Sequence, residues 1–303
     1  MNSTSRIGVL ILNFGEPQTY EHEEVVGFLE RIFDRNSSLE STGENPSSRS
    51  KELARRRAPS LIEEYKSMGG SPLNLQAAQQ AKTVEKELRR RKLNIRCYSG
   101  TQFTKPFIRD AVEQAADDKV EQLVALPIYP LCGKSTTLAA LEDVRTAMDL
   151  LGLDVPIREV TGWHKHPDYL PMRADNISAY ANLREINLHS DDTALVFSAH
   201  GTPIKYLETG PRYTQYVEET CSGISRLLGV SDYNLGYQNH TNRNIEWTSP
   251  GIEDVVNATE QTNMILEAVS FMHEQSETKG AVSYTHLRAH ETDSYLVCRL
   301  LLE

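Results

Sequence analysis

The chain has 303 residues, with 32 lysines and arginines against 42 aspartates and glutamates, so its formal net charge is −10. Because no basic patch dominates such an acidic chain, we expect no nucleic-acid partner. The four cysteines include no Cys-x-x-Cys pair, which argues against a disulfide framework and against a zinc or iron–sulfur site built from neighbouring residues. No signal peptide and no apolar run long enough to span a bilayer is evident, so we expect a cytoplasmic protein; peripheral membrane contact stays open.

The first half of the chain alternates strand-like and helix-like patterns, which predicts an α/β fold with a mostly parallel sheet. An apolar run predicts a buried strand over 7–14, and apolar residues at helical spacing predict a helix over 23–33. Residues 36–59 are rich in Ser, Arg and Glu, and we interpret them as a long surface loop. The other elements expected here are helices over 59–66, 73–92, 106–116 and 136–151, and strands over 94–100, 120–129 and 157–160.

The same pattern then begins again. It predicts helices over 168–188, 213–228 and most of 251–274, strands over 194–199 and 233–238, and a third strand near 280. We therefore expect two similar Rossmann-like lobes with mostly parallel four-stranded sheets, over 1–160 and 161–280. A cleft between such lobes is the usual place for a ligand.

The segment from about residue 281 does not suit the closing strand and helix that this repeat requires. Its apolar residues gather only at 295–302. The segment resembles translated sequencing-adapter read-through appended to an incomplete gene. We therefore expect 281–303 to be a non-native tail and the second lobe to be incomplete.

The most informative stretch is 195–203, where an apolar run ends at His200 and Gly-x-Pro follows at once. The run is typical of a buried parallel strand that Gly-x-Pro ends, which leaves His200 at the carboxyl end. Open α/β sheets bind their ligands at that end. A neutral imidazole there can bind a metal or accept a proton near neutral pH, although a structural role is the alternative for a lone histidine.

Seven ordered groups of residues from 7 to about 275 resemble the ferrochelatases, which insert ferrous iron into a porphyrin. The groups are NFGEP at 13–17 with FLERIF at 28–33, GGSPL at 69–73, LPIYP at 126–130 with STT at 135–137, WHKHP at 163–167, FSAHGTP at 197–203 with GPRYTQ at 210–215, YQ at 237–238, and WTSP at 247–250. The resemblance implies a chelatase-like fold, a lyase activity in haem (porphyrin) biosynthesis, and a catalytic, metal-binding role for His200.

The resemblance also implies two substrates and the residues that bind them. Ferrous iron and a porphyrin, protoporphyrin IX or coproporphyrin III, are the expected partners, and no cofactor is required; an iron–sulfur cluster and the oligomeric state stay open. His240 lies at a strand end and is the second candidate metal ligand. The residues expected to bind the porphyrin are Phe14, Arg31, Ser71, Tyr129, Leu131 and Thr136.

The chain also departs from the family pattern. Cys132-Gly133 stand where Tyr-Ser is common, Gln102-Phe103 where Arg-Tyr is common, and 239–242 where Ser-x-x-Gly is common. The family has a His-x-Glu segment whose acid faces the catalytic histidine, and we find no match, so we expect this chain to lack its acidic partner and to be impaired. The alternatives are a chelatase for another tetrapyrrole with cobalt or nickel, and a two-lobe small-molecule binding protein.

Overall fold

A computed structural model describes residues 6–39, 46–240, 245–282 and 296–297. The chain forms two compact units, Met1–Gly162 and Trp163–Glu303. Each unit is built on a four-stranded parallel sheet, which confirms the predicted α/β class. In the part of the chain that is described, no helix combines the length and the apolar character needed to cross a bilayer.

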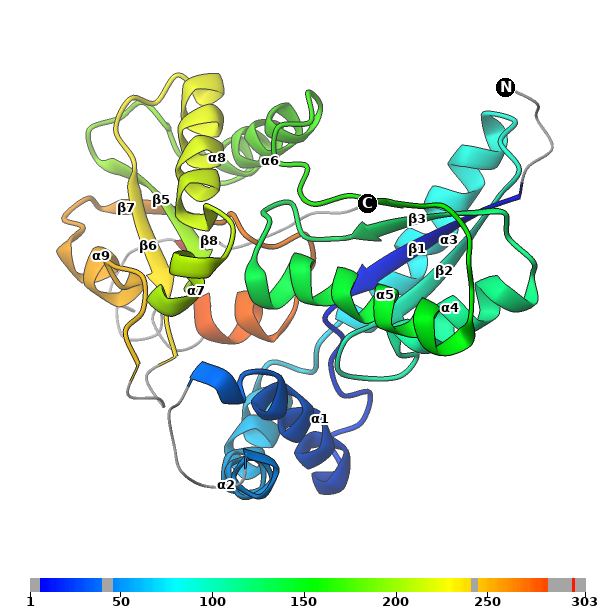
Figure 1. The fold of residues 1–303 in the computed structure, drawn as a ribbon. Helices are drawn as coiled ribbons and strands as arrows, with labels where there is room; N and C mark the ends of the chain where they lie inside the picture. Colours follow the sequence, from blue (N-terminus) through cyan, green and yellow to red (C-terminus); the bar gives the residue numbers. More distant parts are fainter. Residues whose placement is uncertain (1–5, 40–45, 241–244, 283–295, 298–303) are drawn as a thin grey trace. The chain divides into compact units, whose positions relative to one another are not determined.

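The sheet of the first unit has the strand order β2-β1-β3-β4. Its strands are β1 (Ile7–Asn13), β2 (Ile95–Thr101), β3 (Gln122–Pro127) and β4 (Ile157–Glu159). Leu12 of β1 lies in register with Gly100 of β2 and Pro127 of β3. The carboxyl ends of these three strands therefore lie at one edge of the sheet (Figure 1).

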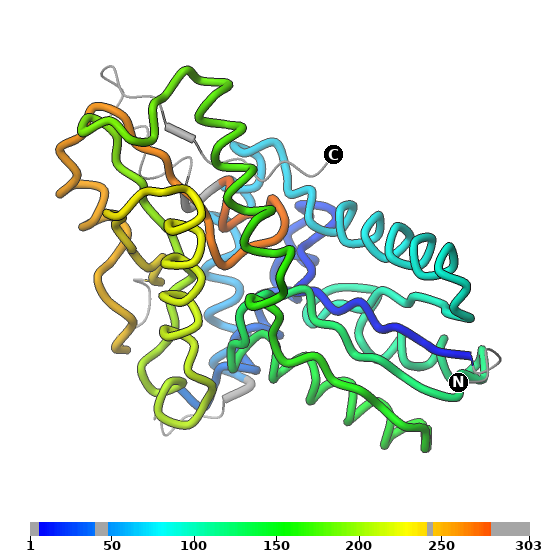
Figure 2. Tube along the Cα trace, turned by 90° about the horizontal axis from the view of Figure 1, so that it is seen from above, coloured from blue at the N-terminus to red at the C-terminus, as the bar shows by residue number. Residues whose placement is uncertain are grey.

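Helices cover both faces of this sheet, which is why β1 is apolar at successive positions. Leu10 and Leu12 pack with α4 (Ile108–Asp117) and α5 (Ala139–Leu151) on one face. Val9 and Ile11 pack toward α3 (Leu73–Arg90) on the other. Figure 2 shows this layering, with α3 in cyan and α5 in green on opposite sides of the strands.

The prediction of a long surface loop over 36–59 is wrong. A short 3₁₀ turn (Ser37–Leu39) is described there, and α2 (Pro46–Ser67) fills the second half and packs on α1 (His22–Arg35). The apolar stripe of α2 is narrow and built partly from alanine among charged residues, so its period is weak in the sequence. The buried members of the stripe are Ala54, Ala58, Leu61 and Tyr65.

The sheet of the second unit has the order β6-β5-β7-β8. Its strands are β5 (Thr193–His200), β6 (Asn234–Gln238), β7 (Asn263–Ala268) and β8 (Leu296–Val297). Its helices are α6 (Tyr169–Leu183), α7 (Ile204–Thr209), α8 (Tyr213–Leu228) and α9 (Ile252–Ala258). One face of the sheet packs on α9, through Ile252 and Val256.

Two predictions near the end of the second unit are wrong. The helix expected over most of 251–274 stops at Ala258, and β7 follows because Met264–Ala268 pair in parallel with β5. At the place of the strand expected near 280 the chain forms a π-helical turn, Glu277–Val282. Apart from 281–282 and the backbone of 296–297, the expected non-native tail lies outside the described residues.

Candidate active and metal site

His200 is the last residue of β5, and its backbone is held on both sides. Its N–H donates to Ser270 Oγ (3.1 Å), and the Tyr213 hydroxyl donates to its carbonyl oxygen (3.0 Å). The hydroxyl oxygens of Tyr213 and Ser270 lie 2.9 Å apart and are hydrogen-bonded, so each of the three residues contacts the other two. The backbone of His200 is thus held by contacts from α8 and from the segment after β7.

The proton on the His200 ring is placed by a backbone acceptor. Nδ1 lies 2.6 Å from the carbonyl oxygen of Gly201. Because a carbonyl can only accept, Nδ1 carries the hydrogen and Nε2 keeps its lone pair. A histidine arranged in this way can bind a metal or take up a proton through Nε2.

Gly201 allows the chain on the neighbouring strand to come close. A Cβ at this position would lie 1.9 Å from Asn239 Oδ1 and 2.6 Å from the carbonyl oxygen of Gln238. The Gly201 N–H instead donates to that same oxygen (2.8 Å). This approach brings the residue after Asn239, which is His240, beside His200, with 5.4 Å between the ring centroids.

Three side chains of the second unit can hold one metal ion. His200, His240 and Glu277 each offer a ligand atom, and these atoms all lie within 4.8 Å of one another. His200 and Glu277 are partly buried and His240 is exposed. Two imidazole nitrogens and one carboxylate oxygen form a donor set that suits ferrous iron and other divalent first-row metals.

The expectation that no acidic residue faces His200 is therefore wrong. Glu277 begins the π-helical turn, and the segment before it contains His273 and Gln275. A search for His-x-Glu misses it because the residue two positions before Glu277 is glutamine. Because Glu277 supplies a carboxylate beside His200, a missing acidic partner is no longer a reason to expect that this chain is impaired.

Electrostatic effects on His200 favour its neutral form. Burial lowers the pKa of His200, and this effect outweighs the neighbouring carboxylate of Glu277, which acts to raise it. The nearby ring of His240 also lowers the pKa. A neutral imidazole is the form that can bind a metal ion or accept a proton.

Aromatic rings and one side-chain hydrogen bond lie beside the two histidines. The ring of Phe271 lies 6.1 Å from that of His200, and the ring of Trp247 lies 5.3 Å from that of His240. Asn239 Nδ2 donates to the carbonyl oxygen of Thr248 (2.7 Å), which joins the residue before His240 to the residue after Trp247.

Three of the predicted porphyrin-binding residues lie in one neighbourhood of the first unit, after β1 and β3 and on α1. Phe14 packs on Phe103, with 4.6 Å between ring centroids, and the Arg31 Nε donates to the Phe103 carbonyl oxygen (2.7 Å). The Tyr129 hydroxyl donates to Oε1 of Gln102 (2.8 Å), the residue before Phe103. Phe14 is half-buried and the Arg31 side chain is exposed. The segment 102–103 therefore connects all three.

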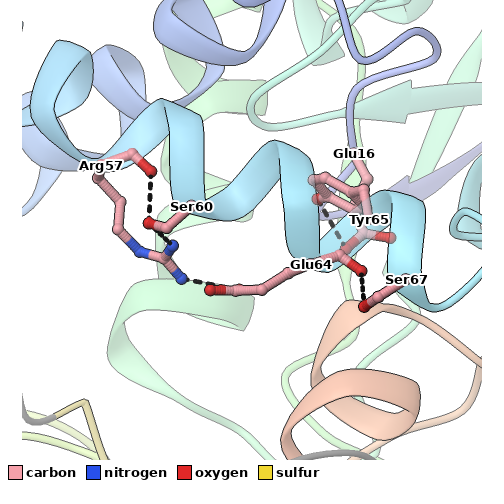
Figure 3. A network of polar contacts seen from close by, with 6 residues as sticks. All are labelled: Glu16, Arg57, Ser60, Glu64, Tyr65 and Ser67. Atoms are coloured by element: carbon pink, nitrogen blue, oxygen red, sulfur yellow. Dashed lines mark hydrogen bonds and ion pairs between the residues drawn. The ribbon is translucent and has the colours of Figure 1, made fainter.

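Ser71 belongs to a different group, centred on the buried carboxylate of Glu16. The Ser71 hydroxyl donates to this carboxylate, and Tyr65 on α2 donates to it as well (3.1 Å, Figure 3). Leu131 is only 2% exposed, so its side chain packs in the protein interior and does not present a surface to a ring. Thr136 is half-buried in the π-helical turn Lys134–Leu138.

Comparison with known proteins gives one consistent result. A family model described as Ferrochelatase matches residues 6–293. A ferrochelatase of Desulfotalea psychrophila is 29% identical over 89% of this chain and 83% of its own length. A ferrochelatase of a Picosynechococcus strain is 31% identical over 90% of this chain and 72% of its own length, and Ferrochelatase-1 of Arabidopsis thaliana is 30% identical over 90% and 60%.

The fold also has a distant match among solved structures. This is CbiX, described as the terminal enzyme for biosynthesis of siroheme in denitrifying bacteria, with a TM-score of 0.48, 12% identity, and coverage of 97% of this chain and 90% of that one. A likeness at this level says nothing about activity. The family model, which spans most of the sequence, together with the named relatives shows that this chain belongs to the ferrochelatase family.

Proposed function

We propose that this protein inserts ferrous iron into a porphyrin, protoporphyrin IX or coproporphyrin III, in haem biosynthesis. The observation that carries the proposal is the meeting of His200, His240 and Glu277, whose ligand atoms lie within 4.8 Å of one another. Membership of the ferrochelatase family supports it. Iron and porphyrin are both substrates in this reaction.

The reaction removes two pyrrole protons and replaces them by one Fe²⁺, so the site must both hold a cation and accept protons. His200 supplies a bare Nε2 because Nδ1 donates to the Gly201 carbonyl. Nε2 has one lone pair, so it can accept a pyrrole proton only after it has released the metal to the macrocycle, and Glu277 beside it is the second base and metal ligand. The proton affinity of His200 is lowered by burial, which also eases release of the proton afterwards.

His240 is proposed as a third ligand for iron before it enters the macrocycle. Two histidines and one carboxylate are a set that non-haem ferrous sites use, with coordination positions left over for other ligands. The pyrrole nitrogens would take those positions as the protein ligands are released. His240, which is exposed, is the ligand that can withdraw with the smallest rearrangement.

For the porphyrin we propose contacts with Phe14, Arg31, Tyr129, Ser71 and Thr136. The half-buried ring of Phe14 supplies apolar surface, and Arg31, an exposed residue, suits a propionate because the planar fork of its guanidinium matches a carboxylate. Leu131 is not retained, because its side chain is packed in the interior.

A second candidate is a chelatase for cobalt or nickel. The second imidazole, His240, favours it, since nitrogen-rich sites bind Co²⁺ and Ni²⁺ more tightly than Fe²⁺. The two candidates differ in the metal that is turned over, so parallel assays with Fe²⁺, Co²⁺ and Ni²⁺ separate them.

The test is anaerobic metal insertion into protoporphyrin IX and coproporphyrin III, followed by the visible spectrum. We expect Fe²⁺ insertion into one of them and a loss of about 10²–10⁴-fold in His200→Ala. His189→Ala is the matched control, because His189 is exposed and lies outside the site. Metallation of neither porphyrin, or equal rates in His200→Ala and His189→Ala, would overturn the proposal.

A further inference from the structure

We infer that Arg173 is a positioning residue that holds Glu277 and His200 together, an inference that rests on the proposed metal site. Arg173 lies on α6 and is 0% exposed, which is unusual for a guanidinium. It forms an ion pair with Glu267, the penultimate residue of β7. Neither residue is one of the metal ligands.

The guanidinium fastens the chain on both sides of the turn that follows β7. Nη2 donates to the carbonyl oxygen of Ala268 (2.9 Å) and Nη1 to that of Phe271 (2.8 Å). Between these carbonyls, the Val269 N–H donates to the carbonyl oxygen of Ser198 on β5 (3.0 Å). The path of the chain from 268 to 271 is therefore fixed by one side chain from α6 and by β5.

This turn contacts His200 directly. Ser270 Oγ accepts the His200 N–H (3.1 Å), and the ring of Phe271 lies 6.1 Å from the His200 ring. The chain leaving the turn then leads to Glu277, whose carboxylate lies within 4.8 Å of the ligand atom of His200. A shift of the turn would move Ser270 and the origin of the Glu277 segment at the same time.

Stability alone does not explain an arginine at this place. Taking a guanidinium and a carboxylate out of water is unfavourable, and buried pairs of this kind are often replaced by apolar residues with no loss of stability. What an apolar pair cannot supply is a planar donor that reaches a carboxylate and two carbonyls at once. Residues that orient metal ligands in this indirect way typically change metal affinity by about 10–100-fold when removed.

The experiment uses Co²⁺ as the probe and measures its binding to the full chain without porphyrin, by the visible absorption of the bound ion. We compare Arg173→Met/Glu267→Met, which removes both charges together and so leaves no unpaired buried ion, with the unaltered chain. Arg173→Lys is the second variant, because it keeps the charge beside Glu267 while its single ammonium cannot bridge both carbonyls. Each change is made again in a Glu277→Gln background.

We expect the Arg173 changes to weaken Co²⁺ binding about 10-fold or more in the unaltered background. In the Glu277→Gln background the same changes should weaken binding by a clearly smaller factor, because one of the two ligands that Arg173 positions is already gone and only its effect on His200 remains. Thermal unfolding shows which variants are folded, and a purely structural role would lower affinity equally in both backgrounds. Equal losses in both backgrounds, or full affinity in a folded variant, would overturn the inference while the proposed site stands; no Co²⁺ binding to the unaltered chain would overturn both.

Discussion

Replacement of Gly201 by alanine tests the close approach that places His240 beside His200. The added Cβ would lie 2.6 Å from the Gln238 carbonyl oxygen and 1.9 Å from Asn239 Oδ1. Neither oxygen can move at low cost, since the first accepts the Gly201 N–H and the amide of Asn239 donates to Thr248. Overpacking of this kind costs about 1–3 kcal/mol, and each of the two hydrogen bonds, if lost, adds about 1 kcal/mol. We therefore expect Gly201→Ala to reduce the free energy of unfolding by about 2–4 kcal/mol.

The same change should displace His240 and weaken Co²⁺ binding, which distinguishes it from a general loss of stability. Gly27→Ala is the matched control, because Gly27 lies inside α1 and its Cβ would meet Arg31 Nη1 at an ordinary 3.4 Å. There we expect a gain of about 0.5–1 kcal/mol from helix propensity and unchanged Co²⁺ affinity. Denaturant unfolding and Co²⁺ titration measure both effects. Unchanged stability and Co²⁺ affinity in Gly201→Ala would refute the reasoning.

Three further outcomes are expected. Burial lowers the pKa of His273 from about 6.5 to about 4. Below pH 6.5 the unfolded chain therefore binds more protons than the folded chain, and the free energy of unfolding should fall by up to about 3 kcal/mol between pH 6.5 and 4. His273→Gln should reduce this dependence in unfolding curves, the buried His200 accounting for part of what remains, while His189→Gln keeps it; the same slope in both would contradict the assignment. Tyr65→Phe removes a donor to the buried carboxylate of Glu16 and should cost about 1–3 kcal/mol, measured by urea unfolding, and no change would show that this bond is not made. Burial raises the pKa of Cys132 to about 11, so its thiol should resist a thiol reagent at pH 8 in the folded chain, and rapid modification would argue against its burial.

Strong local patterns account for the parts of the fold that could be predicted. β1 and β5 are apolar at successive positions because both of their faces are covered, and His200 stands where such a run ends. His240 is predicted as the second candidate ligand only because it lies at a strand end. The structure places it beside His200 because β5 and β6 are parallel, with His200 in register with Gln238, so both strands end at one edge. Elements whose buried residues recur at regular spacing can therefore be predicted from the sequence.

The parts that were missed depend on contacts distant in sequence. The stripe of α2 is partly alanine among charged residues, so its pattern is weak in the sequence, and its burial is evident only from its packing against α1. The short apolar run of β7 has no alternation, so only its pairing with β5 distinguishes it from a helix. Glu277 is separated from His200 by most of the second unit, and the contacts of Ser270 and Arg173 that bring it there leave no local pattern.

The most direct measurement is the anaerobic rate of Fe²⁺ insertion in the unaltered chain, His200→Ala, Glu277→Gln and the double variant. If these two side chains act as one unit on the metal and the pyrrole protons, each single change should lower the rate by about 10²–10⁴-fold, and the double variant should be little slower than the worse single one. A Glu277→Gln variant that inserts iron at the unaltered rate would contradict the central claim, as would losses that simply multiply in the double variant.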